Sequence, residues 1–187
     1  MDIVKNGEWK ERGQEGILWL AINAKYSHTS LAVRYLRECV PGSEILELTI
    51  NHQLLAALGE IYERRPRVLG IACYIWNIEQ TRKLAADLKL ACPNLLFAVG
   101  GPEVSSQGPA FVQQNPWVDF LLRGEGEYPF YRLCQVLHAP QRALETIPGL
   151  IYRQAGKIYV NAEIEPIDFN AVPFPYSMLD CEPDKVL

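Results

Sequence analysis

Hydrophobic residues recur along this chain in two alternating patterns. Short apolar runs predict strands, and longer segments with an apolar residue at every third or fourth position predict helices. The predicted strands are residues 17–22, 44–49, 68–73, 95–99 and 118–122. The predicted helices are residues 30–39, 53–63, 78–91, 104–115 and 127–138. The expected apolar face of the second helix consists of Leu54, Leu55, Leu58, Ile61 and Tyr62.

This succession of strands and helices predicts a doubly wound, Rossmann-like α/β fold, a five-stranded parallel sheet with helices on both faces. Residues 68–73 are apolar throughout, as in a strand that is buried on both faces. We expect the flavodoxin-like strand order 2-1-3-4-5, with a switch point between the first and third strands. Ligands of such folds bind beyond the carboxyl ends of the strands, so we expect contacts in the loops near Asn23, Tyr74 and Gly101.

The pattern changes after residue 138. Residues 148–160 predict a β-hairpin that turns at 154–156, and prolines at 166, 173, 175 and 183 exclude long regular elements beyond it. We therefore expect a poorly ordered tail at 1–15, an α/β domain at 16–140, and a hairpin with a Pro-rich linker at 141–187. In this interpretation the linker leads to a domain that is absent from this chain, and a free terminal tail is the alternative.

Composition and charge narrow the classes of function. The chain has 187 residues, 49% hydrophobic and 21% charged, with a net charge of −4, and no basic cluster indicates a nucleic-acid surface. The polar N-terminus is unlike a signal peptide, and no apolar run approaches the roughly 20 residues of a membrane span, so we expect a cytoplasmic protein. Five cysteines without a Cys-x-x-Cys pair predict reduced, mostly buried thiols.

Two of the apolar runs end abruptly in glycine. Residues 97–103 read Phe-Ala-Val-Gly-Gly-Pro-Glu, and residues 118–127 read Val-Asp-Phe-Leu-Leu-Arg-Gly-Glu-Gly-Glu. Glycine lets a backbone approach a bound molecule closely, because no side chain stands between them. Two such ends on neighbouring parallel strands predict a ligand groove along one edge of the sheet.

The loops after the first and third strands offer candidate chemistry. At the start of the predicted helix 30–39, Ser27, Thr29 or Ser30 would serve as a cap, or the exposed N–H groups would bind a phosphate. Three hypotheses remain open for His28: it is a metal ligand, a hydrogen-bond donor, or a loop residue without a role. In the other loop, Tyr74 and Trp76 would stack on a flat ligand or pack under a partner domain, and core packing by one of them is the alternative.

Three further groups receive simpler interpretations. Asn77 is interpreted as the cap of the helix 78–91. Glu125 and Glu127 resemble an acid–base pair, but no nucleophile accompanies them, and a carboxylate in the first turn of a helix is favourable in itself. We therefore expect no catalytic role for them. His52 and His138 fall at helix ends and are expected on the surface.

Residues 23–28, 68–74, 99–103, 118–127 and 147–152 together resemble the N-terminal cobalamin-binding domain of cobalamin-dependent radical S-adenosylmethionine enzymes. The likeness covers roughly residues 16 to 180, and Gly-Gly-Pro-Glu followed by Arg-Gly-Glu-Gly-Glu carries most of it. It implies that vitamin B12 lies across the carboxyl edge of the sheet. The nucleotide tail would enter between the loops at Asn23, Cys73 and Gly101, and the loop 123–126 would line the same cleft.

The resemblance also implies what this chain does not do. The catalytic half of such enzymes carries a Cys-x-x-x-Cys-x-x-Cys motif for a 4Fe-4S cluster, and no cysteines here have that spacing. We expect a carrier module that is not catalytic alone, from a methyltransferase-type enzyme. S-adenosylmethionine and the iron–sulfur cluster would belong to the downstream radical domain of the same polypeptide, the expected partner.

Two departures from the family pattern concern the cofactor. Many cobalamin-binding domains carry Asp-x-His-x-x-Gly after the first strand, whereas here Tyr26 and Leu31 stand at the Asp and Gly positions around His28. The usual Ser-x-Leu after the third strand is replaced by Cys73-Tyr74-Ile75. We therefore expect base-off cobalamin with no protein histidine on cobalt.

The resemblance and the loop positions together define the predicted cofactor-binding residues, with no catalytic residue and no metal ligand among them. They are Asn23, Lys25, Tyr26, Ser27, His28, Thr29, Cys73, Tyr74, Ile75, Trp76, Gly100, Gly101, Pro102, Glu103, Gly124, Glu125 and Gly126. One alternative is a degenerate docking domain without a cofactor. Another is a flavin or nucleotide binder, although the first loop lacks a glycine-rich phosphate cradle. A receiver-type phosphorylation switch is disfavoured, because the third strand ends in Cys73 and not in an acidic residue.

Overall fold

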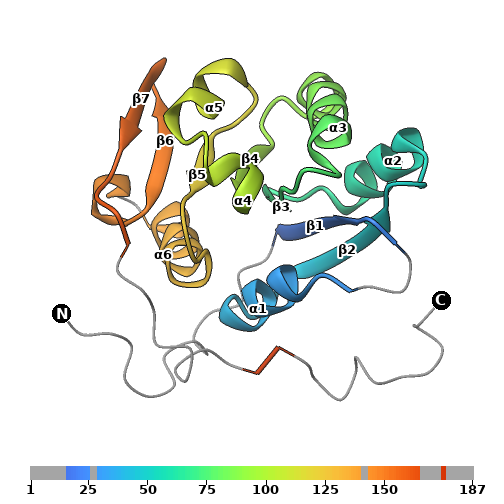
Figure 1. Cartoon of the computed structure of the whole chain (residues 1–187), viewed down its shortest axis with the longest axis horizontal. Coiled ribbons are helices and arrows are strands. Elements are labelled where there is room, and N and C mark those ends of the chain that lie inside the picture. The colour runs from blue at the N-terminus through green and yellow to red at the C-terminus, as the bar shows by residue number, and fades with distance from the viewer. Residues whose placement is uncertain (1–15, 26–28, 140–142, 165–173, 176–187) are drawn as a thin grey trace.

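Seven strands form one mixed sheet in the order β2-β1-β3-β4-β5-β6-β7 (Figure 1). The structure, a computed structural model, describes residues 16–25, 29–139, 143–164 and 174–175. The strands are β1 (Ile17–Asn23), β2 (Glu44–Thr49), β3 (Val68–Ala72), β4 (Leu96–Gly100), β5 (Phe120–Leu122), β6 (Leu150–Gln154) and β7 (Lys157–Val160). The first five strands are parallel in the order 2-1-3-4-5, which confirms the predicted flavodoxin-like arrangement.

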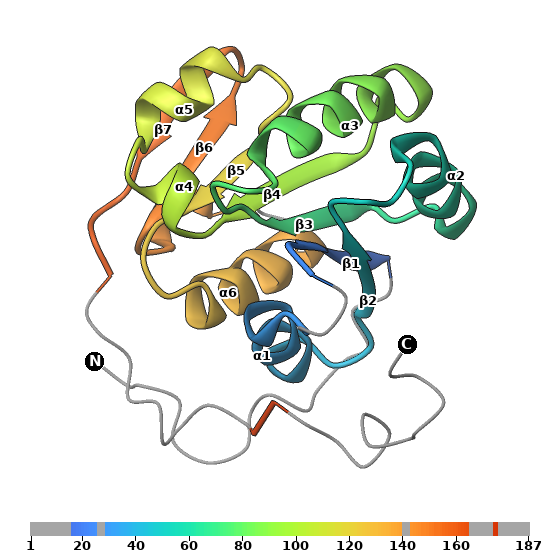
Figure 2. The same cartoon turned by 45° about the vertical axis from the view of Figure 1, so that its right-hand side comes forward.

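Helices cover both faces of the sheet. They are α1 (Leu31–Cys39), α2 (Leu54–Arg64), α3 (Ile78–Ala91), α4 (Pro102–Ser105), α5 (Pro109–Gln114) and α6 (Glu127–His138), and the 3-10 turn η2 (Leu144–Thr146) follows α6. Helices α1 and α6 lie on one face, and α2 to α5 lie on the other (Figure 2). No helix in the described part of the chain is long and apolar enough to cross a membrane.

The strand side chains divide between two cores, one on each face. Along β1, Leu18, Leu20 and Ile22 pack into the core beneath α2 to α5, whereas Trp19 and Ala21 pack into the core beneath α1 and α6. This alternation follows from the two-residue period of a strand. Because every residue of β3 is buried, the prediction that segment 68–73 is covered on both faces is confirmed.

The predicted hairpin forms and continues the same sheet. Strand β6 runs antiparallel to β5, with Phe120 opposite Tyr152, and β7 pairs with β6. The turn lies where it was predicted, with Ala155 and Gly156 both at positive φ. The sheet therefore has seven strands and not five, because the hairpin pairs with an edge of β5 that would otherwise leave its backbone groups unpaired.

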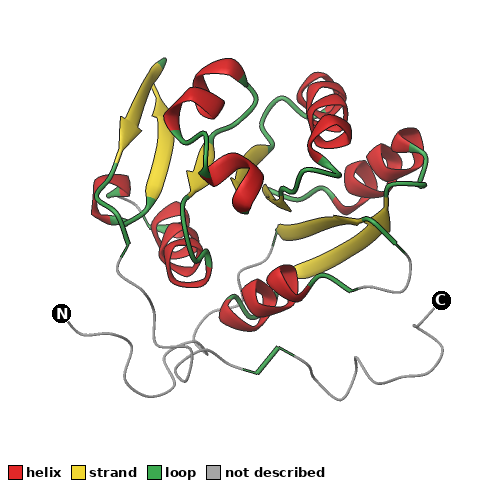
Figure 3. Cartoon of the chain, in the orientation of Figure 1, coloured by secondary structure: helices red, strands yellow, loops and turns green. Residues whose placement is uncertain are grey.

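Two helix predictions need correction. The segment predicted as one helix at 104–115 forms two short helices, α4 and α5 (Figure 3). They are separated where Gly108 adopts φ +52°. In α2, Leu55 and Tyr62 are exposed, and Ala57 is buried in their place. The inward-facing positions are 54, 57, 58 and 61, which have the spacing i, i+3, i+4 and i+7 of one helix face. The prediction included Leu55 and Tyr62 because they are apolar.

Candidate functional site

A cavity of about 170 Å³ lies at the carboxyl ends of β3, β4 and β5, between the sheet and helices α1 and α6. Its walls are mainly apolar, and they include Trp19, Leu36, Ile71, Leu122 and Phe130. The loops that follow the three strands contribute Tyr74, Gly101 and residues 124–126. The predicted groove at the glycine-terminated strands is therefore a cavity on one face of the sheet.

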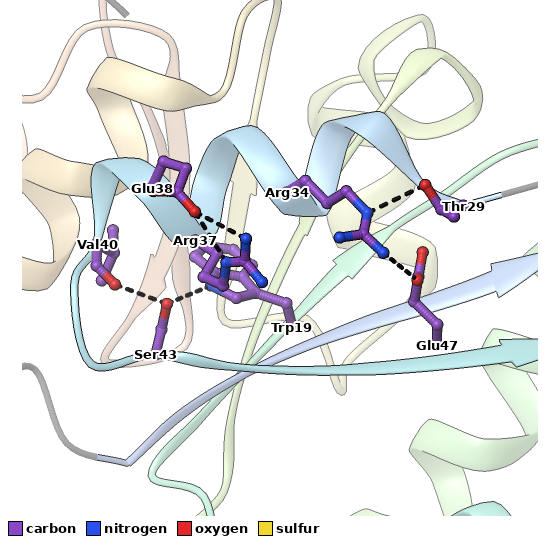
Figure 4. Close-up of polar contacts among 8 residues, drawn as sticks. All are labelled: Trp19, Thr29, Arg34, Arg37, Glu38, Val40, Ser43 and Glu47. Carbon is purple, nitrogen blue, oxygen red and sulfur yellow. Dashed lines mark hydrogen bonds and ion pairs between the residues drawn. The ribbon is translucent and has the colours of Figure 1, made fainter. Parts of the chain in front are cut away.

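The position of Trp19 in the cavity wall is fixed by three neighbours. Its indole N–H donates to the hydroxyl of Ser43 at 2.8 Å, and that hydroxyl donates to the carbonyl oxygen of Val40 at 2.7 Å (Figure 4). Its ring centroid lies 4.1 Å from that of Phe130. A Cβ atom at Gly70 would stand only 2.5 Å from the indole ring, so glycine at that position in β3 makes room for the tryptophan.

The start of α1 is tied to strand β2 by an acidic side chain. The backbone N–H of Ser30 donates to Glu47 Oε1 at 2.5 Å. Arg34 Nη2 donates to Glu47 Oε2 at 3.1 Å (Figure 4). Arg34 Nε also donates to Thr29 Oγ1 at 3.0 Å. Of the three residues proposed as caps, Ser30 occupies the N-cap position but makes no side-chain capping bond. The Ser30 N–H, one of the groups proposed for a phosphate, already has a carboxylate partner.

The loop after β3 presents an aromatic pair at the same edge of the sheet. The rings of Tyr74 and Trp76 stack with centroids 4.5 Å apart and planes 4° from parallel. Tyr74 lines the cavity, whereas Trp76 is 45% exposed and Ile75 is 79% exposed. The indole N–H of Trp76 donates to the carbonyl oxygen of Ile22 at 3.1 Å. Tyr74 also packs against the buried core beneath α1 and α6, as the core-packing alternative expected for one of the two rings, whereas Trp76 remains partly open to a ligand or a partner surface.

Asn77 holds this loop in place, a role that the sequence did not reveal. Its side chain is 1% exposed, accepts a bond from the N–H of Tyr74 at 2.9 Å, and donates to the carbonyl oxygens of Ile22 and Ala72. These bonds join the ends of β1 and β3. The predicted capping role is wrong, because Asn77 makes no side-chain cap bond to α3.

The second glycine of the Gly-Gly pair is required by the fold itself. Gly101 adopts φ +104°, and a Cβ atom there would stand 2.5 Å from the carbonyl oxygen of Cys73. A valine at 101 would therefore strain the fold, because its Cβ would clash with backbone. Gly100 differs, since among the described residues the nearest atom to a Cβ there, apart from its chain neighbours, would be the carbonyl oxygen of Leu122 at 3.7 Å.

Glu127 is the polar group of the cavity that sequence reasoning set aside. Its Oε2 atom is buried, and no hydrogen-bond partner for it exists among the described residues. Burial raises the pKa of this carboxyl above its ordinary value, the N–H of the same residue opposes the shift, and the charge of Glu125 adds to it. A glutamate in the first turn of a helix is ordinary, so there was no reason from sequence to place Glu127 in a cavity.

The four described thiols match the interpretation as reduced, mostly buried side chains, and Cys181 lies outside the described residues. Cys39, Cys73 and Cys134 are buried, and Cys92 is half-buried. Burial raises the pKa of both Cys39 and Cys73 to about 12, so these thiols stay neutral near neutral pH. In the part of the chain that the structure describes, no group of three His, Cys, Asp or Glu side chains is arranged to hold a metal ion.

The structure brings part of the predicted site together. The cavity gathers Tyr74, Gly100, Gly101, Gly124, Glu125 and Gly126. Eight other predicted residues are described but lie outside the cavity wall: Asn23, Lys25, Thr29, Cys73, Ile75, Trp76, Pro102 and Glu103. Tyr26, Ser27 and His28 lie outside the described residues.

One member of the predicted cleft points elsewhere. The side chain of Arg123 donates to the carbonyl oxygen of Asn161 at 2.9 Å and pairs with Glu163 at 3.6 Å, so it contacts the segment after β7 and does not line the cavity. His52 and His138 are exposed, as predicted.

Comparisons with known proteins show the family to which this chain is related. The sequence model of the family described as "B12 binding domain" matches residues 17–134. The cobalamin-dependent radical SAM methyltransferase TokK of Streptomyces tokunonensis is 27% identical over 178 residues, which cover 91% of this chain and 26% of TokK. The 2-(S-pantetheinyl)-carbapenam-3-carboxylate methyltransferase of Streptantibioticus cattleyicolor is 35% identical over 88 residues, 47% of this chain and 13% of that enzyme.

A solved structure has the same fold. The cobalamin-dependent S-adenosylmethionine radical enzyme OxsB, with aqua-cobalamin and S-adenosylmethionine bound, superposes with a TM-score of 0.68 at 17% identity. The match covers 88% of this chain and 24% of OxsB. The chain thus spans about a quarter of the length of TokK and of OxsB.

Proposed function

The chain belongs to the B12 binding domain family, and we propose that it binds cobalamin with the nucleotide tail in the cavity beside Trp19 and Tyr74. The corrin ring would lie across the carboxyl edge of the sheet. The observation that carries this proposal is the cavity of about 170 Å³ that opens where the glycine-rich ends of β4 and β5 meet. Ligands of doubly wound sheets bind at this edge.

The cavity has room for an aromatic ring of the tail base, and its walls suit such a ring. An apolar cavity of about 150 Å³ holds a single aromatic ring, and the cavity here has about 170 Å³. Aromatic and aliphatic walls such as Phe130 and Leu36 favour a flat, neutral group. Gly100 and Gly126 leave this space open, since a Cβ atom at either would meet nothing closer than 3.7 Å.

The aromatic pair Tyr74 and Trp76 would contact the corrin ring of the cofactor. Tyr74 belongs to the cavity wall, and Trp76 stacks on it with its ring partly in solvent. Asn77 fixes the loop through bonds to the ends of β1 and β3. Bound cobalamin supplies a carrier for a one-carbon group, and the residues of this chain bind and orient it.

We further propose that the cobalamin is base-off and that no protein histidine binds cobalt. The support is the sequence around His28, where Tyr26 and Leu31 stand in place of the Asp and Gly of the histidine-ligating pattern. A base that occupies the cavity is no longer free to bind cobalt, so the two proposals are consistent with each other.

In the parent enzyme, this module would deliver cobalamin to a radical S-adenosylmethionine domain of the same polypeptide. The relatives support this proposal, because TokK is a cobalamin-dependent radical SAM methyltransferase about four times as long as the matched region. S-adenosylmethionine and a 4Fe-4S cluster would be held by that domain. Ile75 and Trp76, exposed at the carboxyl edge, would face it.

A docking domain without a cofactor is the second candidate. The exposed Ile75 and Trp76 favour it, since exposed apolar side chains at one edge suit a protein contact. Titration of the purified 187-residue chain with hydroxocobalamin separates the two candidates. Cobalamin binding predicts a saturable change in the visible spectrum at one equivalent. A spectrum equal to that of free hydroxocobalamin throughout the titration would contradict cobalamin binding and support the docking role.

A further inference from the structure

Glu127 is the feature of the cavity that the fold alone does not explain. It is the first residue of α6, and its Oε2 atom is buried without a hydrogen-bond partner among the described residues. A buried polar atom without a partner is costly, so native proteins rarely leave one in place without a reason. Among the described residues, no ion pair involves this carboxyl either.

The surroundings of Glu127 point to a ligand as the missing partner. Of the other described side chains that line the cavity, Tyr74 and Glu125 carry an acceptor, and neither bonds to Glu127 Oε2. Glu125 shares the cavity, and its negative charge makes the ionised form of Glu127 less favourable. Burial acts in the same direction and raises the pKa of the Glu127 carboxyl. A neutral carboxyl group carries one O–H donor, and a hydrogen-bond acceptor on a ligand would satisfy it.

The same surroundings restrict which part of a ligand enters. Among the described residues, no lysine, arginine or histidine lines the cavity and two glutamates do, so a phosphate group would meet no compensating charge from them. A sugar with several hydroxyls would lack partners along the apolar walls. A flat aromatic base with one acceptor nitrogen matches both the walls and the single unpaired polar atom.

We propose that the carboxyl group of Glu127 donates a hydrogen bond to the free ring nitrogen of the benzimidazole base in the cobalamin tail. This inference rests on the proposed function, because it assumes that the tail occupies the cavity. It deepens that function by naming the class of corrinoid that the chain selects: one whose tail base is an aromatic heterocycle with an acceptor nitrogen. Glu127 is thus a specificity-determining residue of the binding site.

The test compares two cofactors across four proteins. The cofactors are cobalamin and a cobamide whose tail base is a phenol, which lacks the ring nitrogen. The proteins are the wild type, Glu127→Leu, Glu127→Gln and the control Glu79→Gln. Glu79 also lies in the first turn of a helix, α3, but its side chain is exposed and pairs with Arg82. Dissociation constants are measured by the change in visible absorbance, and circular dichroism checks that each variant is folded.

We expect Glu127→Leu to weaken cobalamin binding about tenfold and to leave binding of the phenol cobamide within about twofold, because only cobalamin loses a hydrogen bond. Glu127→Gln should recover most of the loss, since an amide also donates. Glu79→Gln should match the wild type with both cofactors. Equal effects of Glu127→Leu on the two cofactors, or no effect on cobalamin, would overturn the proposal.

A measurement on the wild type keeps the proposal testable if Glu127→Leu does not fold. Cobalamin labelled with ¹⁵N in the tail base is bound to the chain, and the resonance of the ring nitrogen is compared with that of free base-off cobalamin. An upfield shift on binding is expected for a nitrogen that accepts a hydrogen bond, and an unchanged resonance contradicts it. If the wild type binds no cobalamin, the proposed function itself fails, and this inference fails with it. If it binds cobalamin without the nitrogen shift, only this inference fails.

Discussion

The backbone of Gly101 lies against that of Cys73 so closely that a Cβ atom on Gly101 would stand 2.5 Å from the Cys73 carbonyl oxygen. This contact joins the loops after β3 and β4 at the edge of the cavity. Gly101 also has φ +104°, a conformation that side-chain-bearing residues rarely adopt. Gly101 is therefore needed to bring the two loops together, whatever binds beside them.

Replacement of Gly101 by valine should lower the stability of the fold. The backbone strain and the clash with Cys73 together should reduce the free energy of unfolding by about 2–4 kcal/mol. Urea denaturation of the unliganded chain measures this change. Gly59→Ala is the matched control, because a Cβ at Gly59 in α2 meets nothing within 4 Å, and it should not destabilise the chain. Equal stability of Gly101→Val and the wild type would contradict the role given to this contact.

Replacement of Gly100 by valine should affect the ligand and not the fold. A Cβ at this position has open space around it, with its nearest neighbour at 3.7 Å, and the residue lines the cavity. Cobalamin affinity should fall by tenfold or more, about 1.4 kcal/mol per factor of ten, while the urea midpoint stays near that of the wild type. Unchanged affinity in a folded Gly100→Val variant would place the tail elsewhere.

The parallel part of the fold was predictable, because buried strands and amphipathic helices leave local patterns. The apolar run at 68–73 is an example, since β3 is buried throughout. The attachment of the hairpin to β5 was not predictable, because the pairing of Phe120 with Tyr152 depends on residues 32 positions apart and on which sheet edge is open. The break at Gly108 was missed because a single glycine within a helical pattern does not reveal its φ angle.

Some residues of the candidate site were also predictable from local sequence, and others were not. Gly100 and Gly124 were found because glycine after an apolar strand is a local signal. Asn77 and Glu127 were assigned to helix starts, where their residue types are ordinary. What distinguishes them is burial and the identity of distant neighbours, such as Ile22 for Asn77. Sequence position alone carries neither fact.

Asn77→Ala should destabilise the aromatic loop and the chain. The variant removes three hydrogen bonds, and it leaves the carbonyl oxygens of Ile22 and Ala72 without this partner in a buried setting. We expect a loss of about 2–3 kcal/mol in the free energy of unfolding. Thr146→Ala is the control, since Thr146 makes one exposed side-chain bond, to Ala143. A loss no larger than that of the control would show that Asn77 does not fix the loop.

Glu127 should make the stability of the unliganded chain depend on pH. Burial raises its pKa in the folded state above the ordinary value of 4.5, so the folded chain holds more protons than the unfolded chain above that pH. The contribution is fully present below the ordinary pKa and is lost as pH rises through the folded pKa. The nearby Cys39 thiol, with a pKa of about 12, does not titrate in this window. Urea midpoints from pH 4 to 7 should fall in the wild type relative to Glu127→Gln, and parallel profiles would contradict the assignment.

His28→Ala tests the state of the cofactor. Because the Asp and Gly of the histidine-ligating pattern are missing around His28, the variant should bind cobalamin with a visible spectrum close to that of the wild type. Electron paramagnetic resonance of the reduced complex should show the same ligands in both proteins. Loss of a nitrogen ligand in the variant would identify His28 as an axial ligand to cobalt.

The most direct test of the central claim is a crystal structure of the chain grown with saturating cobalamin. We predict density for the benzimidazole base inside the cavity, in contact with Tyr74, Gly100 and Glu127, and density for the corrin ring across the carboxyl edge of the sheet. A cavity without the base, in a crystal that holds cobalamin elsewhere or holds none, would contradict the account.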